Sequence, residues 1–216
     1  MRSGSDAAEL DAVTIDAFGT LLELVDPAPA LAGALRERGL ERDPESIARA
    51  FTAEVAYYIP RSHEGRDAES LAALRRECAS VFLAELGVEL EPGEFAPAFV
   101  GALEFRVADG ALSALDALRS AGFVLACVAN WDVSLGERLG AAGLADRFAL
   151  ILSSAEAGAE KPDPRIFELA LARLGTKPGR TLHVGDGEAD REGARAAGLA
   201  FEPVPLATLP ERLGLG

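Results

Sequence analysis

Short apolar segments of strand length recur along the second half of the chain, and one more stands near its start. The first reads Ala-Val-Thr-Ile-Asp and ends in an acid. The segments are apolar throughout instead of alternating with polar residues, which is typical of parallel strands buried on both faces. The predicted strands occupy residues 12–16, 123–129, 148–154, 181–185 and 199–204.

Helical patterns separate the later strands. Strands that alternate with helices indicate a parallel sheet with helices on both faces, so the predicted fold class is α/β. The predicted helices occupy residues 111–122, 133–144, 164–175 and 189–198.

The alternation is interrupted after the first strand, where residues 27–108 look helical and are punctuated by proline and glycine. We therefore predict a core formed by residues 1–24 and 108–216 and an all-helical insertion at residues 25–107. Ligands of open α/β sheets bind at the carboxyl ends of the strands. An insertion that leaves the first strand is thus expected to lie over that end as a cap.

The composition of the chain argues against several classes of function. The 216 residues include 35 acidic and 21 basic side chains, and the formal charge of −14 argues against a general nucleic-acid binder. No segment approaches the roughly 20 apolar residues of a membrane span. Cys78 and Cys127 are predicted to be buried free thiols. We expect a cytoplasmic monomer or homodimer that binds neither nucleic acid nor membrane.

Polar residues follow the ends of four predicted strands. Asp16 ends the first strand, Asn130 follows the second and Lys161 follows the third, while Asp186 and Asp190 follow the fourth. The carboxyl ends of parallel strands meet at one edge of the sheet. Three carboxylates and one ammonium there would repel or pair at high cost without a ligand. A divalent cation offsets that repulsion, and carboxylate oxygens suit Mg²⁺.

These segments resemble, in this order, the haloacid dehalogenase-like hydrolase superfamily. The resemblance spans residues 12–200 and implies a Rossmann-like core with the type 1 helical cap of subfamily I. It rests on the segments Asp16–Leu21, Asn130, Lys161–Pro164 and Gly185–Asp190.

The resemblance also implies roles for these residues. Asp16 would be the nucleophile that forms a covalent ester with the substrate. Mg²⁺ is expected between Asp16, the backbone carbonyl of Phe18 and Asp186. Asp190 is expected as a further ligand or as the group that orients a metal-bound water. Lys161 would neutralise Asp16 and a phosphate oxygen.

The remaining phosphate contacts are assigned to Asn130 and to backbone N–H groups around it, including Ala129. Thr20 is a further candidate for phosphate binding, and its hydroxyl is expected to fix the turn after the nucleophile. Two positions depart from the family's phosphatases. Phe18 replaces the acid that usually protonates the leaving group, which costs about 10²–10⁴ in rate. Ala129 replaces a serine or threonine, which removes one phosphate hydrogen bond.

Phe18 also resembles the 2-haloacid dehalogenase branch, because a halide leaves without a proton. That branch needs no metal and usually has Ser and Asn where this chain has Gly185–Gly187. The sequence therefore favours a Mg²⁺-dependent phosphatase that acts on a small phosphomonoester through an aspartyl-phosphate on Asp16. A 2-haloacid dehalogenase acting on a halogenated substrate, and a weakly active or non-catalytic binding descendant, are the alternatives.

Aromatic and polar side chains concentrate at residues 56–70 within the predicted cap. Tyr57, Arg61 and His63 are candidates for reading the substrate, since arginine suits a carboxylate or a second phosphate. The alternative interpretation, which the sequence favours, is a solvated connection between two helices with the tyrosines packed between them. His183, inside the fourth predicted strand, is interpreted as a packed strand residue.

Overall fold

The chain divides into two compact units in the computed structural model, which describes residues 10–215. The core unit runs to Glu23 and resumes at Arg106, and the helical unit is Leu24–Phe105. Residues 1–9, which were predicted as part of the core, lie outside the described residues.

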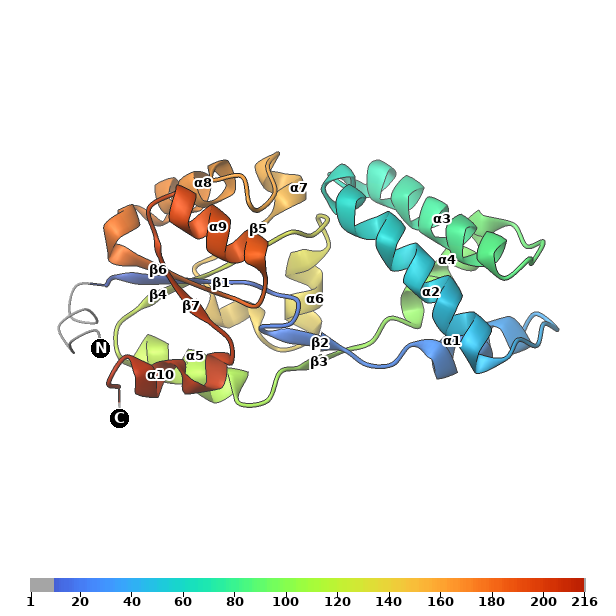
Figure 1. Ribbon diagram of the computed structural model, residues 1–216, viewed down its shortest axis with the longest axis horizontal. Coiled ribbons are helices and arrows are strands. Elements are labelled where there is room, and N and C mark those ends of the chain that lie inside the picture. The colour runs from blue at the N-terminus through green and yellow to red at the C-terminus, as the bar shows by residue number, and fades with distance from the viewer. Residues whose placement is uncertain (1–9, 216) are drawn as a thin grey trace. The chain divides into compact units, whose positions relative to one another are not determined.

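Five parallel strands form the sheet of the core unit, in the order β5-β4-β1-β6-β7 (Figure 1). β1 (Ala12–Ile15) pairs with β4 (Val124–Ala129) on one side and with β6 (Thr181–Gly185) on the other. The edges are β5 (Leu150–Ser153) and β7 (Ala200–Pro203). All five predicted strands are present, so the predicted α/β class with a parallel sheet is confirmed.

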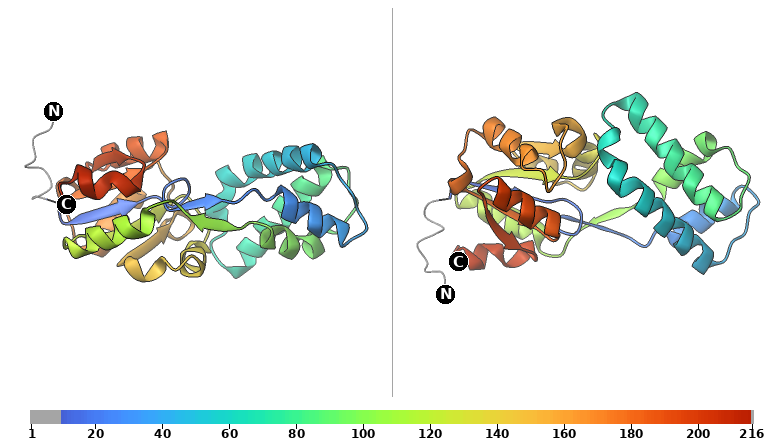
Figure 2. Two further views of the ribbon diagram at one scale, coloured as in Figure 1. Left: turned by 90° about the horizontal axis from the view of Figure 1, so that it is seen from below. Right: turned by 45° about the horizontal axis from the view of Figure 1, so that its top comes forward.

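Helices cover both faces of this sheet, as Figures 1 and 2 show, with α8 and α9 on one face and α5 and α10 on the other. β1 and β6 are buried along their whole length, which explains their unbroken apolar pattern. The helices of the core unit are α5 (Ala111–Ser120), α6 (Leu135–Ala141), α7 (Ser154–Ala157), α8 (Arg165–Leu174), α9 (Glu188–Ala196) and α10 (Leu209–Arg212). Single 3₁₀ turns are η3 (Ala145–Arg147), η4 (Pro178–Arg180) and η5 (Leu206–Thr208).

The helical unit has its own apolar core. The Phe82 ring lies 6.0 Å from the Phe95 ring and 5.2 Å from the Phe99 ring, centroid to centroid. Cys78 is buried in the same cluster, and Cys78 and Cys127 are both buried thiols outside any disulfide, as predicted. The elements of this unit are α1 (Ala28–Arg36), α2 (Pro44–Tyr58), η2 (Ile59–Glu64), α3 (Ala68–Glu85) and α4 (Pro92–Gly101).

Two short strands were missed by the sequence analysis. β2 (Leu22–Leu24) pairs with β3 (Phe105–Val107) in a two-stranded sheet, so the interpretation of residues 27–108 as helical was wrong at β3. Three residues are too few to give a periodic signal. Along the described residues, no helix combines the length and apolarity that a bilayer crossing requires.

Leu115 and Leu112 test the packing of α5, because they lie on one helix but only Leu115 is fully buried, whereas Leu112 is 40% exposed. Leu115→Ala is expected to lower the free energy of unfolding by about 2–5 kcal/mol, since it leaves a cavity. Leu112→Ala, the same chemical change, is expected to cost about 0.5 kcal/mol or less. Urea unfolding followed by circular dichroism measures both losses, and equal losses would contradict this packing.

Candidate active site

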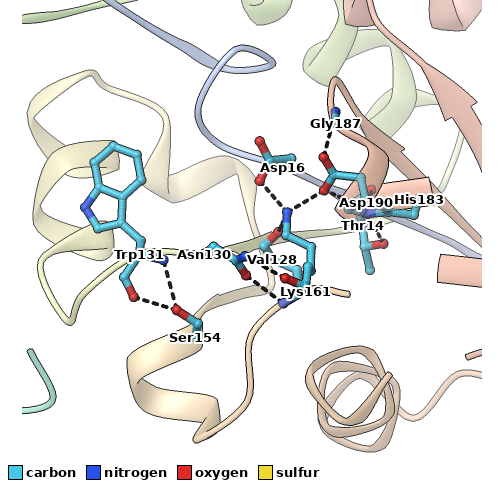
Figure 3. Close-up of polar contacts among 10 residues, drawn as sticks. All are labelled: Thr14, Asp16, Val128, Asn130, Trp131, Ser154, Lys161, His183, Gly187 and Asp190. Carbon is cyan, nitrogen blue, oxygen red and sulfur yellow. Dashed lines mark hydrogen bonds and ion pairs between the residues drawn. The ribbon is translucent and has the colours of Figure 1, made fainter. Parts of the chain in front are cut away.

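The structure brings the predicted strand-end residues together at the carboxyl edge of the sheet. Asp16 directly follows β1, Asn130 follows β4, and Asp186 follows β6. Lys161 lies in the loop between α7 and α8, and Asp190 lies in the first turn of α9. Figure 3 shows how four of these side chains converge from separate segments of the chain.

Lys161 is the centre of the cluster. Its Nζ donates to Oδ1 of Asp16, to Oδ1 of Asp190 and, at 3.0 Å, to the carbonyl oxygen of Val128. An ammonium has three hydrogens, so these three acceptors satisfy it completely. Burial alone would lower the pKa of Lys161, but the charges of Asp16 and Asp190 raise the pKa overall. The buried lysine therefore stays charged.

Asp16 is buried, and this burial is the main reason that its pKa rises to about 6. Lys161 lowers the pKa of Asp16, while the carboxylates of Asp190 and Asp186 raise it further. A carboxyl group with a pKa near 6 is mostly ionised at neutral pH. Asp16 can thus act as a nucleophile without a separate base.

Asp190 is held by donors on both carboxylate oxygens. Its Oδ1 accepts from Lys161 and lies 3.0 Å from Nε2 of His183, and its Oδ2 accepts the N–H of Gly187 at 3.0 Å. Burial alone would raise the pKa of Asp190, but the hydrogen bond from His183 and the charge and hydrogen bond of Lys161 lower it overall. In this arrangement Asp190 orients Lys161, a role that the sequence analysis did not include.

The carboxylates of Asp16, Asp186 and Asp190 fit a divalent cation. Each offers an oxygen within 4.8 Å of the other two. Gly19 has a φ of +76°, and a Cβ there would lie 2.2 Å from Oδ2 of Asp186. Only glycine therefore allows this approach of the turn to the carboxylate. Hard oxygen ligands of this kind favour Mg²⁺ over softer metals.

Asn130 makes two hydrogen bonds to the backbone of Lys161. Its Nδ2 donates to the Lys161 carbonyl at 2.9 Å, and its Oδ1 accepts the Lys161 N–H at 2.7 Å. The side chain therefore anchors the loop that holds the lysine, and one Nδ2 hydrogen remains for a ligand. Ala129, the last residue of β4, is buried and adds no side-chain polar group.

The turn after Asp16 differs from the prediction at Thr20. Its side chain is buried and, among the described residues, its hydroxyl has no hydrogen-bond partner. The expectation that this hydroxyl fixes the turn is wrong. Backbone bonds close the turn instead, from Gly19 N–H to Leu22 O and from Leu22 N–H to Ala17 O, both at 2.9 Å. The Phe18 ring in the same turn is 52% exposed.

Tyr57, Arg61 and His63 belong to the helical unit. The Tyr57 hydroxyl donates to Oε2 of Glu77 at 2.9 Å, and the Arg61 guanidinium lies 4.1 Å from the centroid of the Tyr57 ring. His63 lines a cavity of about 510 Å³ on the same unit. Their part in substrate recognition stays a prediction. The cavity is lined by His63, Glu64, Arg66, Ser70, Ala73, Leu74 and Glu77.

His183 is packed as predicted, with its ring edge-on to Phe167 at 4.7 Å between centroids. Burial lowers the pKa of His183 to about 4. The sequence analysis missed its polar contacts, since Nδ1 lies 2.9 Å from Oγ1 of Thr14 and Nε2 faces Asp190. The only available signal was a histidine inside an otherwise apolar strand.

Comparison with known proteins gives three concordant similarities. A family described as haloacid dehalogenase-like hydrolase matches residues 10–198. Haloacid dehalogenase-like hydrolase domain-containing protein 3 of Bos taurus is 41% identical over 107 residues, which are 47% of this chain and 43% of that protein. Phosphoglycolate phosphatase of Nitrosospira multiformis is 33% identical over 203 residues, covering 91% of this chain and 83% of that protein.

Among solved structures, the HAD-hydrolase YfnB from Bacillus subtilis, in a crystal form bound to magnesium, is similar with a TM-score of 0.75. It is 21% identical, and the similarity covers 95% of this chain and 99% of that one. At this identity the similarity shows the fold alone. The aligned segment of the bovine relative spans less than half of its length, so the whole-protein properties of that relative do not transfer directly.

Lys161→Met tests whether the buried ammonium holds the cluster together. The change leaves two buried carboxylates without a cation and is expected to cost about 3–5 kcal/mol of unfolding free energy at neutral pH. Without Lys161 the pKa of both carboxyl groups rises. A carboxyl group whose pKa is raised by folding stabilises the folded state increasingly as the pH falls below that raised pKa, because the folded chain then binds a proton that the unfolded chain does not. The loss of unfolding free energy in Lys161→Met is thus expected to become smaller as the pH falls from about 7 to about 5.

Lys177→Met is the matched control, because Lys177 is exposed and is the other lysine of the chain. It is expected to change stability by about 0.5 kcal/mol or less at either pH. Urea titrations of both variants give the comparison. A Lys161→Met deficit that matches the control, or that grows as the pH falls, would contradict the role of the ammonium.

Proposed function

The chain belongs to the haloacid dehalogenase-like hydrolase family, and we propose that it is a Mg²⁺-dependent phosphatase of small phosphomonoesters with Asp16 as its nucleophile. The observation that best supports this proposal is the buried contact of Lys161 with Asp16 beside the carboxylates of Asp186 and Asp190. Relatives named as phosphatases, including the Nitrosospira enzyme, point to the same reaction class.

Asp16, Asp186 and the backbone carbonyl of Phe18 would hold Mg²⁺, with Asp190 beside them. When bound, the ion supplies positive charge that shields the carboxylates from an incoming phosphate and polarises the phosphoryl group. A structural neighbour is bound to magnesium, in line with this set of oxygen ligands.

Asp16 performs the first chemical step in this proposal. Its carboxylate oxygen attacks phosphorus, the bond from phosphorus to the leaving oxygen breaks, and an aspartyl-phosphate forms. Water then attacks the same phosphorus, which releases inorganic phosphate and restores the carboxylate. Lys161, held against Asp16, offsets the negative charge that the phosphate brings to the site.

Asn130, the backbone N–H groups around Ala129 and Thr20 would bind further phosphate oxygens. The Thr20 hydroxyl, which is buried and has no partner among the described residues, would have to become accessible to do so. Phe18 offers no proton to the leaving group. The leaving oxygen must therefore depart as a stable anion or take its proton from water. This arrangement favours substrates with good leaving groups.

We assign the helical unit the role of a type 1 cap of subfamily I, with Tyr57, Arg61 and His63 as its substrate-reading residues. The dehalogenase alternative is disfavoured by Asp186. This carboxylate lies within 4.8 Å of the other two and would repel the carboxylate of a haloacid unless a cation were bound.

Hydrolysis of para-nitrophenyl phosphate tests the proposed reaction. We expect turnover that requires Mg²⁺, stops on addition of EDTA, and falls by at least about 10³-fold in Asp16→Asn. Asp163→Asn is the control, because Asp163 is close to Lys161 in sequence but its carboxylate is bonded to Arg165. Halide release from 2-chloropropionate that survives EDTA would instead identify a dehalogenase, and the absence of turnover on both substrates would indicate a binding protein.

Phe18→Asp tests whether the missing acid limits the reaction. Because an aspartate there can protonate the leaving group, we expect kcat for alkyl phosphates to rise by up to about 10²-fold and kcat for para-nitrophenyl phosphate to change much less. Phe18→Asn has the same shape but transfers no proton, and it is expected to give no selective gain. Equal effects of the two variants on both substrates would refute this assignment.

A further inference from the structure

A line of buried hydrogen bonds runs from β1 through β6 to the cluster around Lys161 (Figure 3). Oγ1 of Thr14 lies 2.9 Å from Nδ1 of His183, and Nε2 of His183 lies 3.0 Å from Oδ1 of Asp190. The same Oδ1 accepts from Lys161, which also donates to Asp16. Two residues outside the proposed catalytic set are thus connected to the nucleophile.

The neighbouring strands fix the geometry of this line. Thr14 and His183 are direct register partners in the parallel pairing of β1 with β6. Both side chains are fully buried, and the His183 ring is flanked by Phe167 at 4.7 Å and Phe201 at 6.3 Å between centroids. The ring is therefore confined between strand residues and aromatic rings, with no exposure to solvent.

The hydrogen-bond partners of the two ring nitrogens show which nitrogen of His183 carries the proton. The ionised carboxylate of Asp190 only accepts hydrogen bonds, so Nε2 must hold the proton that it donates. Nδ1 of the neutral ring is then an acceptor, and the Thr14 hydroxyl is the donor that matches it. The proton arrangement is Thr14 O–H to Nδ1, and Nε2–H to Asp190.

A competing arrangement exists on the Thr14 side. The carbonyl oxygen of Thr14 lies 3.1 Å from Nδ1 and would accept a proton placed there. That tautomer would turn the lone pair of Nε2 toward the carboxylate of Asp190, which is repulsive. The Thr14 hydroxyl has the Leu182 carbonyl as another acceptor, but at 3.4 Å it is farther away than Nδ1. Asp190 therefore selects the Nε2–H tautomer, and the Thr14 hydroxyl supports it by donating to Nδ1, which would otherwise face only the Thr14 carbonyl oxygen.

We propose that Thr14 and His183 are positioning residues, which hold Asp190 through the Nε2–H tautomer and thereby place the Lys161 ammonium against Asp16. Only the expected effect of these residues on kcat rests on the proposed function. Neither residue touches the substrate in this scheme. Partners of this kind, which orient the groups that act on the substrate, typically affect activity by about 10–100-fold when they are removed.

The tautomer is measurable without any activity. Histidine labelled with ¹⁵N gives two imidazole spin systems, because the chain contains only His63 and His183, and His63→Gln assigns them. In the wild-type chain we expect a protonated Nε2 and an unprotonated Nδ1 at His183. In Thr14→Val the proton stays on Nε2 because Asp190 is unchanged, but Nδ1 loses its donor, so we expect the Nδ1 resonance of His183 to move downfield.

The second part of the test measures the hydrolysis of para-nitrophenyl phosphate in the presence of Mg²⁺. We expect Thr14→Val to lower kcat by about tenfold with little change in KM, because Lys161 is displaced while substrate binding persists. Thr14→Ser keeps the hydroxyl and is expected to recover both the wild-type Nδ1 resonance and most of kcat. Thr181→Val removes another buried threonine hydroxyl, one bonded to the Lys177 carbonyl at 3.1 Å, and controls for packing.

Each outcome decides the proposal. A wild-type His183 with its proton on Nδ1, or on both nitrogens, overturns it, and so does a Thr14→Val variant in which the Nδ1 resonance is unchanged. A loss of kcat that is the same in Thr181→Val, or that Thr14→Ser does not recover, also overturns it. If the wild-type chain hydrolyses no phosphate, the proposed function fails, while the tautomer measurement still tests the hydrogen-bond line by itself.

Discussion

The buried ammonium of Lys161 is the interaction on which the rest of the site depends. Two carboxylates are buried beside it, and removing two anions from water costs several kcal/mol each unless charge and hydrogen bonds compensate. Lys161 meets that condition because all three of its hydrogens have acceptors. Without it, Asp16 would neutralise by taking a proton. The proposed nucleophile and the stability of the fold therefore depend on the same cation.

The backbone around the cluster is shaped to allow this crowding. Glycines stand where the carboxylates approach the chain most closely. A Cβ at Gly185 would lie 2.3 Å from Cγ of Asp190, and one at Gly19 would lie 2.2 Å from Oδ2 of Asp186. Asn130 anchors the loop of Lys161 by two backbone hydrogen bonds. The cluster of charged side chains therefore depends on Gly19, Gly185 and Asn130 as well as on the charged residues themselves.

The sheet and the convergence of the site were predictable from sequence for a simple physical reason. Fully buried parallel strands are uniformly apolar, and the polar residues that end them must meet at one edge. The contacts of Thr14 with His183 were not predictable, because they depend on the register between strands 169 positions apart in the chain. β2 and β3 were missed because each has three residues. The role of Thr20 was misjudged because backbone bonds already close its turn.

The two sides of the candidate site differ in how far their polar groups are satisfied. Around Lys161 and Asp190 each donor has an acceptor, so that side is preorganised and needs no rearrangement when charge develops. In and near the turn after Asp16, Asp186 is exposed, the Phe18 ring is 52% exposed, and the Thr20 hydroxyl has no partner among the described residues. A ligand can reach the Asp186 carboxylate and the Phe18 side chain, whereas the Thr20 hydroxyl is buried, and Phe18 has no proton to give to a leaving oxygen. In the proposed mechanism the nucleophile is thus prepared by the protein, and the choice among substrates falls on the stability of the group that leaves.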